Sequence, residues 1–529
     1  MQTIFNKNFT KSLLSAILLW LAWCPNGYSF LIFLGFVPLL IIEFRYWQNR
    51  GRKTNAKFFG FSYLTMLIWN LLTTWWVTYA SFEGALLAFI MNSLLMSLVL
   101  LLFHHTHKKT NHLIGYSSFI CYWLAFEYLH LNWDMSWPWL TLGNAFADSY
   151  KYIQWYEFTG TQGGSLWILL LNVLVFYWLF IVENKKKIAL NISLLIVLPT
   201  IVSVVIYYNY SEKIEPVNIV VSQPNIDPYN EKFSGMMNEE QIIKSLKVSS
   251  NLIDKETDYW VAPETTIALD VQENELDTCP EVKILQKIID NYPNLKMVLG
   301  ASTYIQYDEP ITVTARQNKN NYKFYDSFNS AIQVEKNSKV KVYHKSKLVP
   351  GVEIIPFPKE MKYFEKYAIN LGGSTGSLGM QNDREVFANA TNKGVVAPII
   401  CYESVYSEYV RNYVKNGANI LFIVTNDGWW DNTPGHIQHL AYARLRAIEN
   451  RRSIARSANT GISAFYNQRG DIIQQTKWWQ ATAIKAALNL NNQQTLFVIL
   501  GDIIYKIAVA FSFCIVVATM FSKQLKIKN

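Results

Sequence analysis

Residues 395–404, VVAPIICYES, place a single cysteine at the end of an apolar run that predicts a buried β-strand. A helical pattern follows over residues 404–416, so Cys401 is expected at a strand-to-helix turn. A thiol at such a turn is accessible to reactants, and the amides of a helix N-terminus favour its thiolate form. Isolated cysteines at buried strand ends are more often inert packing, so the position alone does not establish chemistry.

Two more predicted strands are each followed by one charged residue. Glu264 follows Tyr259–Ala262, where a carboxylate suits a general base, although turn or cap carboxylates are commoner. Lys345 follows Val340–Tyr343, where an ammonium can stabilise an oxyanion and lower the pKa of a thiol. The ordinary alternative for this lysine is a solvated charge, and Lys347 is a rival two residues later.

These segments lie in an alternation of β-branched runs and helical patterns over residues 209–496, which predicts a layered α/β domain. The remainder is apolar: 51% of the 529 residues are hydrophobic and only 16% are charged, against about 25% charged in soluble domains. The apolar runs predict about eight transmembrane helices, seven in a membrane domain (1–208) and the eighth in 497–529. Five cysteines without a CxxC pair indicate neither a disulfide scaffold nor a zinc site.

The net charge of +9 has a topological explanation. Fifteen basic residues gather in short loops that share one side if the chain crosses the membrane eight times, and such an excess marks the cytoplasmic side. Subtracting them leaves −6 for the remainder, so no nucleic-acid partner is predicted. Both termini are expected in the cytoplasm, and residues 209–496 outside it. The fifteen are Lys7, Lys11, Arg45, Arg50, Arg52, Lys53, Lys57, Lys108, Lys109, Lys185, Lys186, Lys187, Lys523, Lys526 and Lys528.

Three motifs carry a resemblance to a known family. Pro-Glu-Thr at 263–265, Tyr-x-Lys-x-x-Leu-Val-Pro at 343–350 and Ile-Cys-Tyr-Glu at 400–403 follow three strands in this order. The set resembles the carbon–nitrogen hydrolase (nitrilase) superfamily, and over the whole chain the pattern is similar to the apolipoprotein N-acyltransferases. This resemblance implies a polytopic α-helical membrane domain joined to a nitrilase-like αββα sandwich. It also implies a bacterial inner-membrane enzyme whose catalytic domain faces the periplasm.

The resemblance assigns roles to individual residues. Glu264 matches the general base, Lys345 the oxyanion-stabilising lysine and Cys401 the nucleophile. Phe233 takes the place of a family tryptophan near the mouth of the site, although this match needs a one-residue gap. A second departure is Gly-Val at 351–352, where the family usually has Phe-Gly, so the local turn must differ. The positions that match supporting residues are Glu353, Tyr402, Glu403 and Asn329.

The implied reaction is a ping-pong acyl transfer without a metal or an organic cofactor. Cys401 would take a fatty acyl group from a phospholipid, and the α-amine of the diacylglyceryl cysteine of an apolipoprotein would then attack the thioester. One rival is a membrane-tethered amidase with the same triad, but a tether needs one span only. The other rival is a transporter or receptor, which would favour ionisable residues inside the spans, and these are few here.

Four weaker patterns each have two interpretations. Trp429 and Trp430 follow a predicted core strand and either contact lipid or pack in a turn. His436 and His439 either pair on a metal or are ordinary residues of a helix face. The aromatic loop 128–162 is either an interfacial belt or the wall of a lipid-entry site. The arginines at 444, 446, 451, 452 and 456 indicate a solvated, ion-paired helix or, with lower prior, a phospholipid headgroup site.

Overall fold

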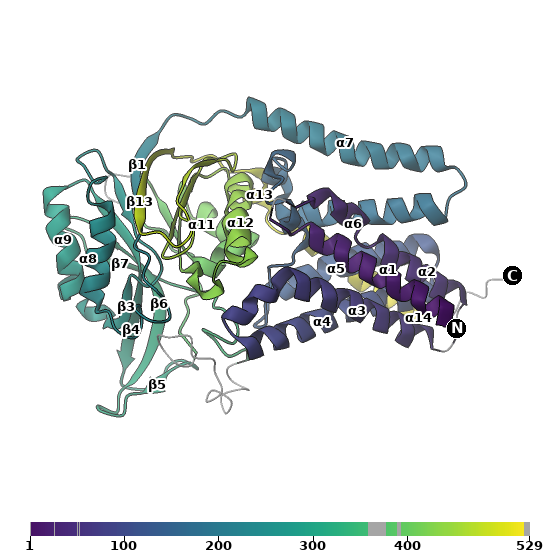
Figure 1. The fold of residues 1–529 in the computed structure, drawn as a ribbon, viewed down its shortest axis with the longest axis horizontal. Coiled ribbons are helices and arrows are strands. Elements are labelled where there is room, and N and C mark those ends of the chain that lie inside the picture. The colour runs from purple at the N-terminus through teal and green to yellow at the C-terminus, as the bar shows by residue number, and fades with distance from the viewer. Residues whose placement is uncertain are drawn as a thin grey trace. The chain divides into compact units, whose positions relative to one another are not determined.

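The computed structural model describes residues 2–25, 27–49, 51, 53–357, 377–388 and 393–522. The chain divides into two compact units, which Figure 1 shows as a helical part and a mixed α/β part. One unit comprises residues 1–209 and 500–529, here called the membrane unit. The other, the catalytic unit, comprises residues 210–499. The basic residues Arg50, Arg52, Lys523, Lys526 and Lys528 lie outside the described residues.

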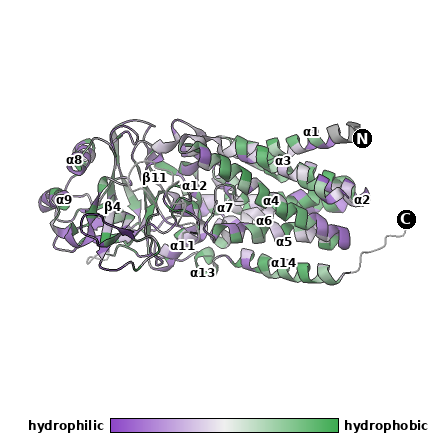
Figure 2. Cartoon of the chain, turned by 90° about the horizontal axis from the view of Figure 1, so that it is seen from below, coloured by the Kyte–Doolittle hydropathy of each residue, from purple (hydrophilic) through white to green (hydrophobic). Residues whose placement is uncertain are grey.

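The membrane unit consists mainly of helices, and hydrophobic residues prevail along several of them (Figure 2). Polar caps start individual helices: Ser81 Oγ accepts a hydrogen bond from Gly84 N at 3.0 Å where α4 begins. In the same way Asn111 Oδ1 accepts from Ile114 N at 2.9 Å at the start of α5. The helices are α1 (Gln2–Leu21), α2 (Val37–Asn49), α3 (Thr54–Thr74), α4 (Phe82–Lys109), α5 (His112–Leu131), α6 (Tyr156–Phe180), α7 (Lys185–Asn209) and α14 (Ile503–Phe521).

The predicted count of about eight transmembrane helices is not confirmed. Within the described residues, five helical segments are long and apolar enough to cross a bilayer. Other helices of this unit carry more polar residues, which are hydrogen-bonded inside the bundle. Asn92 Nδ2 on α4, for example, donates to Asn70 Oδ1 on α3 at 2.7 Å. The five segments are Ser29–Asn49, Phe82–Lys109, Tyr156–Phe180, Lys185–Asn209 and Ile503–Phe521.

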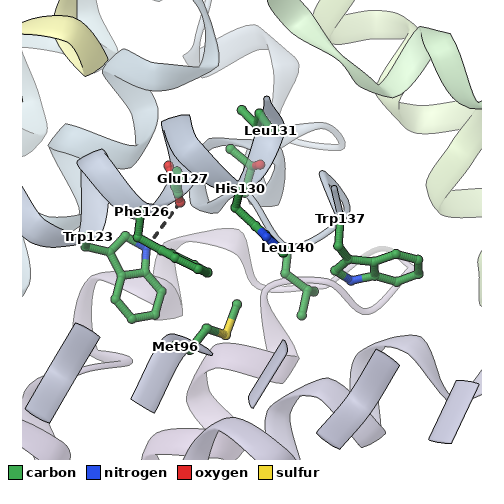
Figure 3. Close-up of a pocket in the computed structure, with 9 residues that line it drawn as sticks. Met96, Trp123, Phe126, Glu127, His130, Leu131, Trp137 and Leu140 are labelled. Atoms are coloured by element: carbon green, nitrogen blue, oxygen red, sulfur yellow. Dashed lines mark hydrogen bonds between the residues drawn. The ribbon is translucent and has the colours of Figure 1, made fainter. Parts of the chain in front are cut away.

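The aromatic loop after α5 packs around a buried carboxylate. Glu127 accepts hydrogen bonds from Trp123 Nε1 at 3.2 Å and, across the unit, from Tyr505 OH of α14 at 2.8 Å. Beside it, His130 and Trp137 line a cavity that is otherwise mainly apolar (Figure 3). This cavity has room for about one water molecule. It is therefore too small to hold an acyl chain as it stands.

The catalytic unit contains two β-sheets. The larger has the order β13-β1-β2-β4-β6-β5, with β3 paired to β4 and β7 to β6, and the smaller has the order β12-β11-β10-β9-β8. The strands of the larger sheet are β1 (Pro216–Gln223), β2 (Tyr259–Val261), β3 (Ile267–Gln272), β4 (Lys296–Tyr307), β5 (Arg316–Gln317), β6 (Phe324–Val334), β7 (Lys341–His344) and β13 (Thr482–Asn489). Those of the smaller sheet are β8 (Val396–Ile400), β9 (Ile420–Thr425), β10 (Ile454–Ala458), β11 (Ala464–Tyr466) and β12 (Ile472–Gln475).

Helices cover the outer faces of both sheets, so the unit has the predicted αββα layering. Helices α8 (Asn238–Ser249) and α9 (Pro280–Asn291) pack on the larger sheet around an apolar core that includes Trp260 and Leu285. Helices α11 (Ser407–Lys415) and α12 (Pro434–Asn450) cover the smaller sheet. The sheets contact each other through β1 with β10, β4 with β9, and β6 with β8. The short helix α13 (Leu496–Leu500) follows β13.

Candidate active site

Cys401 occupies a sharp turn at the end of β8. Its φ of 49° lies in the left-handed region, which costs a residue other than glycine about 1–2 kcal/mol. Local hydrogen bonds hold the turn: Ser404 Oγ donates to the Cys401 carbonyl at 2.7 Å, and Ile400 N donates to Glu403 Oε2 at 2.9 Å. The residues that follow form a 3₁₀ turn, Cys401–Val405, before α11 begins. Strand β8 therefore ends at Cys401 in a turn whose φ is strained and which local hydrogen bonds stabilise.

Glu264 follows β2 in a second tight turn, and this turn requires a glycine beside it. Thr265 has a φ of 49°, and Gly300 N of the neighbouring β4 donates to the Pro263 carbonyl at 3.1 Å. A Cβ atom at Gly300 would lie 2.5 Å from Glu264 Cα. Any larger residue at 300 would therefore displace the backbone that carries the Glu264 carboxylate.

Lys345 connects Glu264 to a second carboxylate. Its Nζ donates to Glu264 Oε1 at 3.2 Å and to Glu353 Oε1 at 2.8 Å, and its side chain is only 1% exposed. Asn329 of β6 contacts the same two oxygens, because its Nδ2 donates to Glu264 Oε1 at 2.8 Å and to Glu353 Oε1 at 2.9 Å. We call Glu264, Asn329, Lys345 and Glu353 the charged cluster. The two carboxylates thus share one amide donor, which fixes their positions beside the buried ammonium.

The charged cluster and burial set the protonation of the reactive groups. Burial disfavours the Lys345 ammonium, but the carboxylates of Glu264 and Glu353 raise its pKa well above the usual value. Burial also raises the pKa of the Cys401 thiol; the Glu264 carboxylate raises it further, while Lys345 opposes the increase. Burial and the neighbouring Glu264 carboxylate thus favour the protonated form of the Cys401 thiol.

Glu403 connects the cysteine turn to the lysine segment. Its carboxylate accepts hydrogen bonds from Ser346 N, from Tyr343 OH and from Tyr409 OH, each at 2.8 Å, in addition to the bond from Ile400 N. Burial raises the pKa of this carboxyl, and these donors partly offset the effect. One side chain therefore ties the strand that precedes Cys401 to the residue that follows Lys345. This position accounts for a supporting role that the sequence match alone could not explain.

The three aromatic candidates do not form one group. The Phe233 ring stacks on Trp429, with centroids 5.9 Å apart and an interplanar angle of 17°. Trp430 instead packs against His439, with ring centroids 5.6 Å apart. All three rings are partly exposed. Tyr402 is buried and packs edge-on against Tyr406.

The altered turn at 351–352 keeps the supporting glutamate in place. Gly351 has a φ of 82° with open space around it, and Glu353 N donates to the Val349 carbonyl at 2.9 Å. Val349 N in turn donates to Glu353 Oε2 at 2.7 Å. The glycine accommodates a left-handed turn that still delivers Glu353 to Lys345.

The prediction of a solvated, ion-paired arginine helix is wrong about solvation for four of its five residues, although Arg446 does pair with Glu449 at 2.7 Å. Arg446, Arg451, Arg452 and Arg456 are at most 3% exposed. Their guanidinium groups donate to main-chain carbonyls, as in the bonds from Arg446 Nη1 to Val405 O at 2.7 Å and from Arg452 Nε to Ala418 O at 2.9 Å. A guanidinium group offers several N–H donors in one fixed plane, which suits buried carbonyl groups. Local sequence patterns cannot reveal these contacts between distant residues.

The histidines at 436 and 439 are buried as well, at 2% and 1% exposure. His436 stacks on Trp478, with ring centroids 4.0 Å apart. His439 instead reaches the turn at Cys401, a contact that the sequence analysis missed. In the described part of the chain, no three histidine, cysteine, aspartate or glutamate side chains are arranged to hold a metal ion.

Cys401 in a strained turn and a buried ammonium between two carboxylates lie within an αββα sandwich, an arrangement that suits a thiol-dependent acyl-transfer enzyme of the nitrilase type. Residues 221–496 match the carbon-nitrogen hydrolase family, and residues 15–174 match the apolipoprotein N-acyltransferase N-terminal domain. The chain therefore belongs to the carbon-nitrogen hydrolase family and, within it, to the apolipoprotein N-acyltransferases.

Similar proteins share this organisation over most of their length. The apolipoprotein N-acyltransferase of Chlorobaculum tepidum is 27% identical, covering 95% of this chain and 94% of its own. That of Geobacter metallireducens is 24% identical, covering 94% and 92%. Among solved structures, a variant of a Nesterenkonia amidase from the nitrilase superfamily covers 53% of this chain and 93% of its own, with 13% identity and a TM-score of 0.35.

Proposed function

We propose that this enzyme moves a fatty acyl group from a membrane phospholipid, through a thioester on Cys401, to the N-terminal α-amine of the diacylglyceryl cysteine of an apolipoprotein. The observation that carries the proposal is the charged cluster, because it supplies a base and a buried cation to a thiol whose proton must be removed. The membrane unit supports a phospholipid donor that arrives through the bilayer. Four of the five segments that are apolar enough to span a membrane lie before residue 210.

In the first half-reaction, the Glu264 carboxylate takes the proton of the Cys401 thiol while the sulfur attacks the ester carbonyl carbon. The carbonyl becomes an oxyanion, which the Lys345 ammonium and the backbone N–H of Tyr402 stabilise. Collapse of this intermediate breaks the ester C–O bond, and Glu264 returns the proton to the departing oxygen. A lysophospholipid leaves, and the acyl group remains on Cys401 as a thioester.

In the second half-reaction, the α-amine of the acceptor attacks the thioester and Glu264 takes a proton from the nitrogen. The same oxyanion site stabilises the second tetrahedral intermediate. Its collapse breaks the C–S bond, the proton returns to sulfur, and an amide is released. Glu353 and Asn329 keep Glu264 and Lys345 aligned through both steps, and Glu403 keeps Cys401 in register with Lys345.

The proposed topology is a bacterial inner-membrane protein with eight spans: residues 1–208 carry seven and residues 497–529 the eighth. Residues 209–496 face the periplasm and both termini face the cytoplasm, in keeping with the lysines that begin α7. A membrane-impermeant thiol label applied to intact cells tests this arrangement. A cysteine introduced at the exposed Tyr322 should be labelled, while one at Lys186 should not. The reverse pattern would contradict the proposed orientation.

The acyl-enzyme itself is the decisive measurement. Purified protein in detergent is incubated with a phospholipid of defined chains and examined by intact mass, before and after treatment with hydroxylamine. We expect a hydroxylamine-sensitive gain of one acyl group on the wild type and none on Cys401→Ala or Glu264→Ala. Cys279→Ala is the matched control, because Cys279 is also a buried cysteine of the catalytic unit but lies at the start of α9.

A diacylglyceryl peptide with a free N-terminus should then discharge the thioester and gain the acyl group. The same peptide with an acetylated N-terminus should not. A wild-type protein that takes no acyl group but releases ammonia from small amides would overturn the proposal in favour of an amidase.

A further inference from the structure

A buried polar pair lies directly behind the cysteine turn and takes no part in the chemistry described above. His439 of α12 lies with Nδ1 3.0 Å from Asp427 Oδ1, and its Nε2 lies 2.9 Å from Ser404 Oγ and 3.3 Å from the Cys401 carbonyl oxygen. Both side chains of the pair are almost fully buried, at 1% exposure or less. A buried polar pair that contacts the backbone of Cys401 calls for a structural explanation.

Asp427 is held as a carboxylate in this position. Burial would raise its pKa, but the Arg456 guanidinium, whose Nη2 lies 2.6 Å from Oδ2, and His439 hold the pKa of the carboxyl well below its usual range. Thr425 Oγ1 donates to Asp427 Oδ1 at 2.9 Å and fixes its orientation. Arg456 Nη2 also lies 3.2 Å from Nδ1, so the Asp427 carboxylate and the Arg456 guanidinium together fix this edge of the imidazole. The opposite nitrogen, Nε2, is thereby aimed at the turn.

A carbonyl oxygen only accepts hydrogen bonds, so in the contact with the Cys401 carbonyl the imidazole Nε2 is the donor. The Cys401 carbonyl then receives two donors, His439 Nε2 and Ser404 Oγ. In a trans peptide unit the C=O and the following N–H point in opposite directions. Fixing the Cys401 carbonyl against α12 therefore fixes the direction of the Tyr402 N–H, the second oxyanion donor of the proposed function.

We propose that His439, oriented by Asp427, is a positioning residue that locks the Cys401–Tyr402 peptide so that the Tyr402 N–H is aimed at the oxyanion. The inference rests on the proposed function, because it assigns the device that completes its oxyanion site. The histidine acts through the backbone of the nucleophile and not on the thiol proton. Its loss should therefore slow reactions that form an oxyanion and spare reactions of the thiol that form none.

Two single-turnover rates distinguish an effect of His439 on the oxyanion from an effect on the thiol. Acylation by phospholipid, followed by intact mass, passes through a tetrahedral oxyanion, whereas alkylation of Cys401 by iodoacetamide does not. His439→Leu removes the donor, and His439→Gln keeps a side-chain N–H of similar reach. His436→Gln is the matched control, since His436 lies one turn earlier on α12 and stacks on Trp478. Thermal midpoints identify any variant that fails to fold.

For His439→Leu we expect acylation to slow by about 10²-fold, the effect of removing one oxyanion donor. The phospholipid concentration for half-maximal rate and the alkylation rate should each stay within about threefold of wild type. His439→Gln should recover at least about tenfold of the lost acylation rate, and His436→Gln should match the wild type.

Acylation of His439→Leu at the wild-type rate would overturn the inference, and so would a parallel loss of alkylation. If His439→Leu does not fold, the comparison rests on His439→Gln, whose acylation must then fall relative to its alkylation. Absence of acylation in the wild type is a different result, because it would overturn the proposed function itself.

Discussion

Lys345 and Lys232 lie in the same unit, each with 1% of its surface exposed, and they meet opposite electrostatic conditions. Lys345 Nζ contacts two carboxylates, and these raise its pKa well above the usual value despite burial. Lys232 has one hydrogen-bond acceptor among the described residues, Gln241 Oε1 at 3.3 Å. Burial lowers its pKa to about 7, and the more distant Glu264 carboxylate opposes the decrease.

The difference shows that burial alone does not decide the charge of a lysine in this enzyme. The number of carboxylates within hydrogen-bond distance decides it, because each anion offsets part of the desolvation penalty. A catalytic cation must stay charged while its environment excludes water, and the charged cluster meets both conditions. Lys232 meets only the second, which makes it a natural reference for each variant of Lys345.

The largest expected effect comes from Lys345→Met. The substitution removes the oxyanion cation and leaves Glu264 and Glu353 without their shared partner. We expect the acylation rate to fall by at least about 10³-fold and the free energy of unfolding to fall by about 3–5 kcal/mol. Acyl-enzyme formation and denaturant unfolding measure the two losses, with Lys232→Met as the matched variant. Equal losses in both variants would show that the carboxylates do not distinguish the two lysines.

Removing one of the two carboxylates should have an intermediate effect. In Glu353→Gln the Lys345 ammonium keeps Glu264 as its anion but loses the second negative charge, and the single amide oxygen cannot accept from both Lys345 Nζ and Val349 N. We expect acylation to slow by about 10²-fold, the usual cost of displacing a catalytic group by about 1 Å. Titration of acylation against pH should show no loss from lysine deprotonation below pH 9, since Glu264 still favours the ammonium. A loss near pH 8 in this variant would mean that Glu353 alone keeps the lysine charged.

Two members of the charged cluster, Glu264 and Lys345, could be approached from the sequence because each follows a recognisable strand. The boundaries of helices α9 (Pro280–Asn291) and α12 (Pro434–Asn450) can also be recognised in the sequence, and Thr433 caps α12. These segments carry strong local signals: a proline at the first helical position and an apolar stripe at helical spacing.

Other features depend on contacts between distant residues and leave no local signal. Strand β10 has a weak local signal, because Arg456 lies at its centre and pairs with Asp427, 29 residues earlier in the chain. The function of His439 was missed for the same reason, because its partner Cys401 lies 38 residues away. The sequence around Lys232 likewise gives no local sign that this lysine is buried in the folded protein.

Lys232→Met tests the other side of the comparison through the pH dependence of stability. In wild type the unfolded lysine binds a proton below about pH 10.4, whereas the folded one does so only below about pH 7. The unfolded state thus holds more protons between these values, so wild-type stability should rise as pH increases from 7 to 10.

The Met variant should lose this slope and gain about 3 kcal/mol near pH 7, because a depression of roughly three pKa units costs about 4 kcal/mol and the lost bond to Gln241 offsets about 1 kcal/mol of it. Urea unfolding at pH 7 and pH 9.5 measures both values. An unchanged slope would mean that Lys232 is charged in the folded protein and is not the counterpart of Lys345.

The smallest effect should come from changes around Glu403. This buried carboxyl group differs from those near Lys345 because its hydrogen-bond donors are neutral hydroxyl and amide groups. Tyr409→Phe removes one donor at 2.8 Å, and Tyr413→Phe removes a weaker one at 3.5 Å. We expect Tyr409→Phe to lower the free energy of unfolding by about 1 kcal/mol and Tyr413→Phe by less, with acylation within about threefold of wild type in both. The reason is that several other donors remain on the carboxylate, so the turn at Cys401 keeps its link to Ser346. A large loss of acylation in Tyr409→Phe, without loss of stability, would place this hydroxyl in the reaction and would mean that Glu403 does more than hold two segments together.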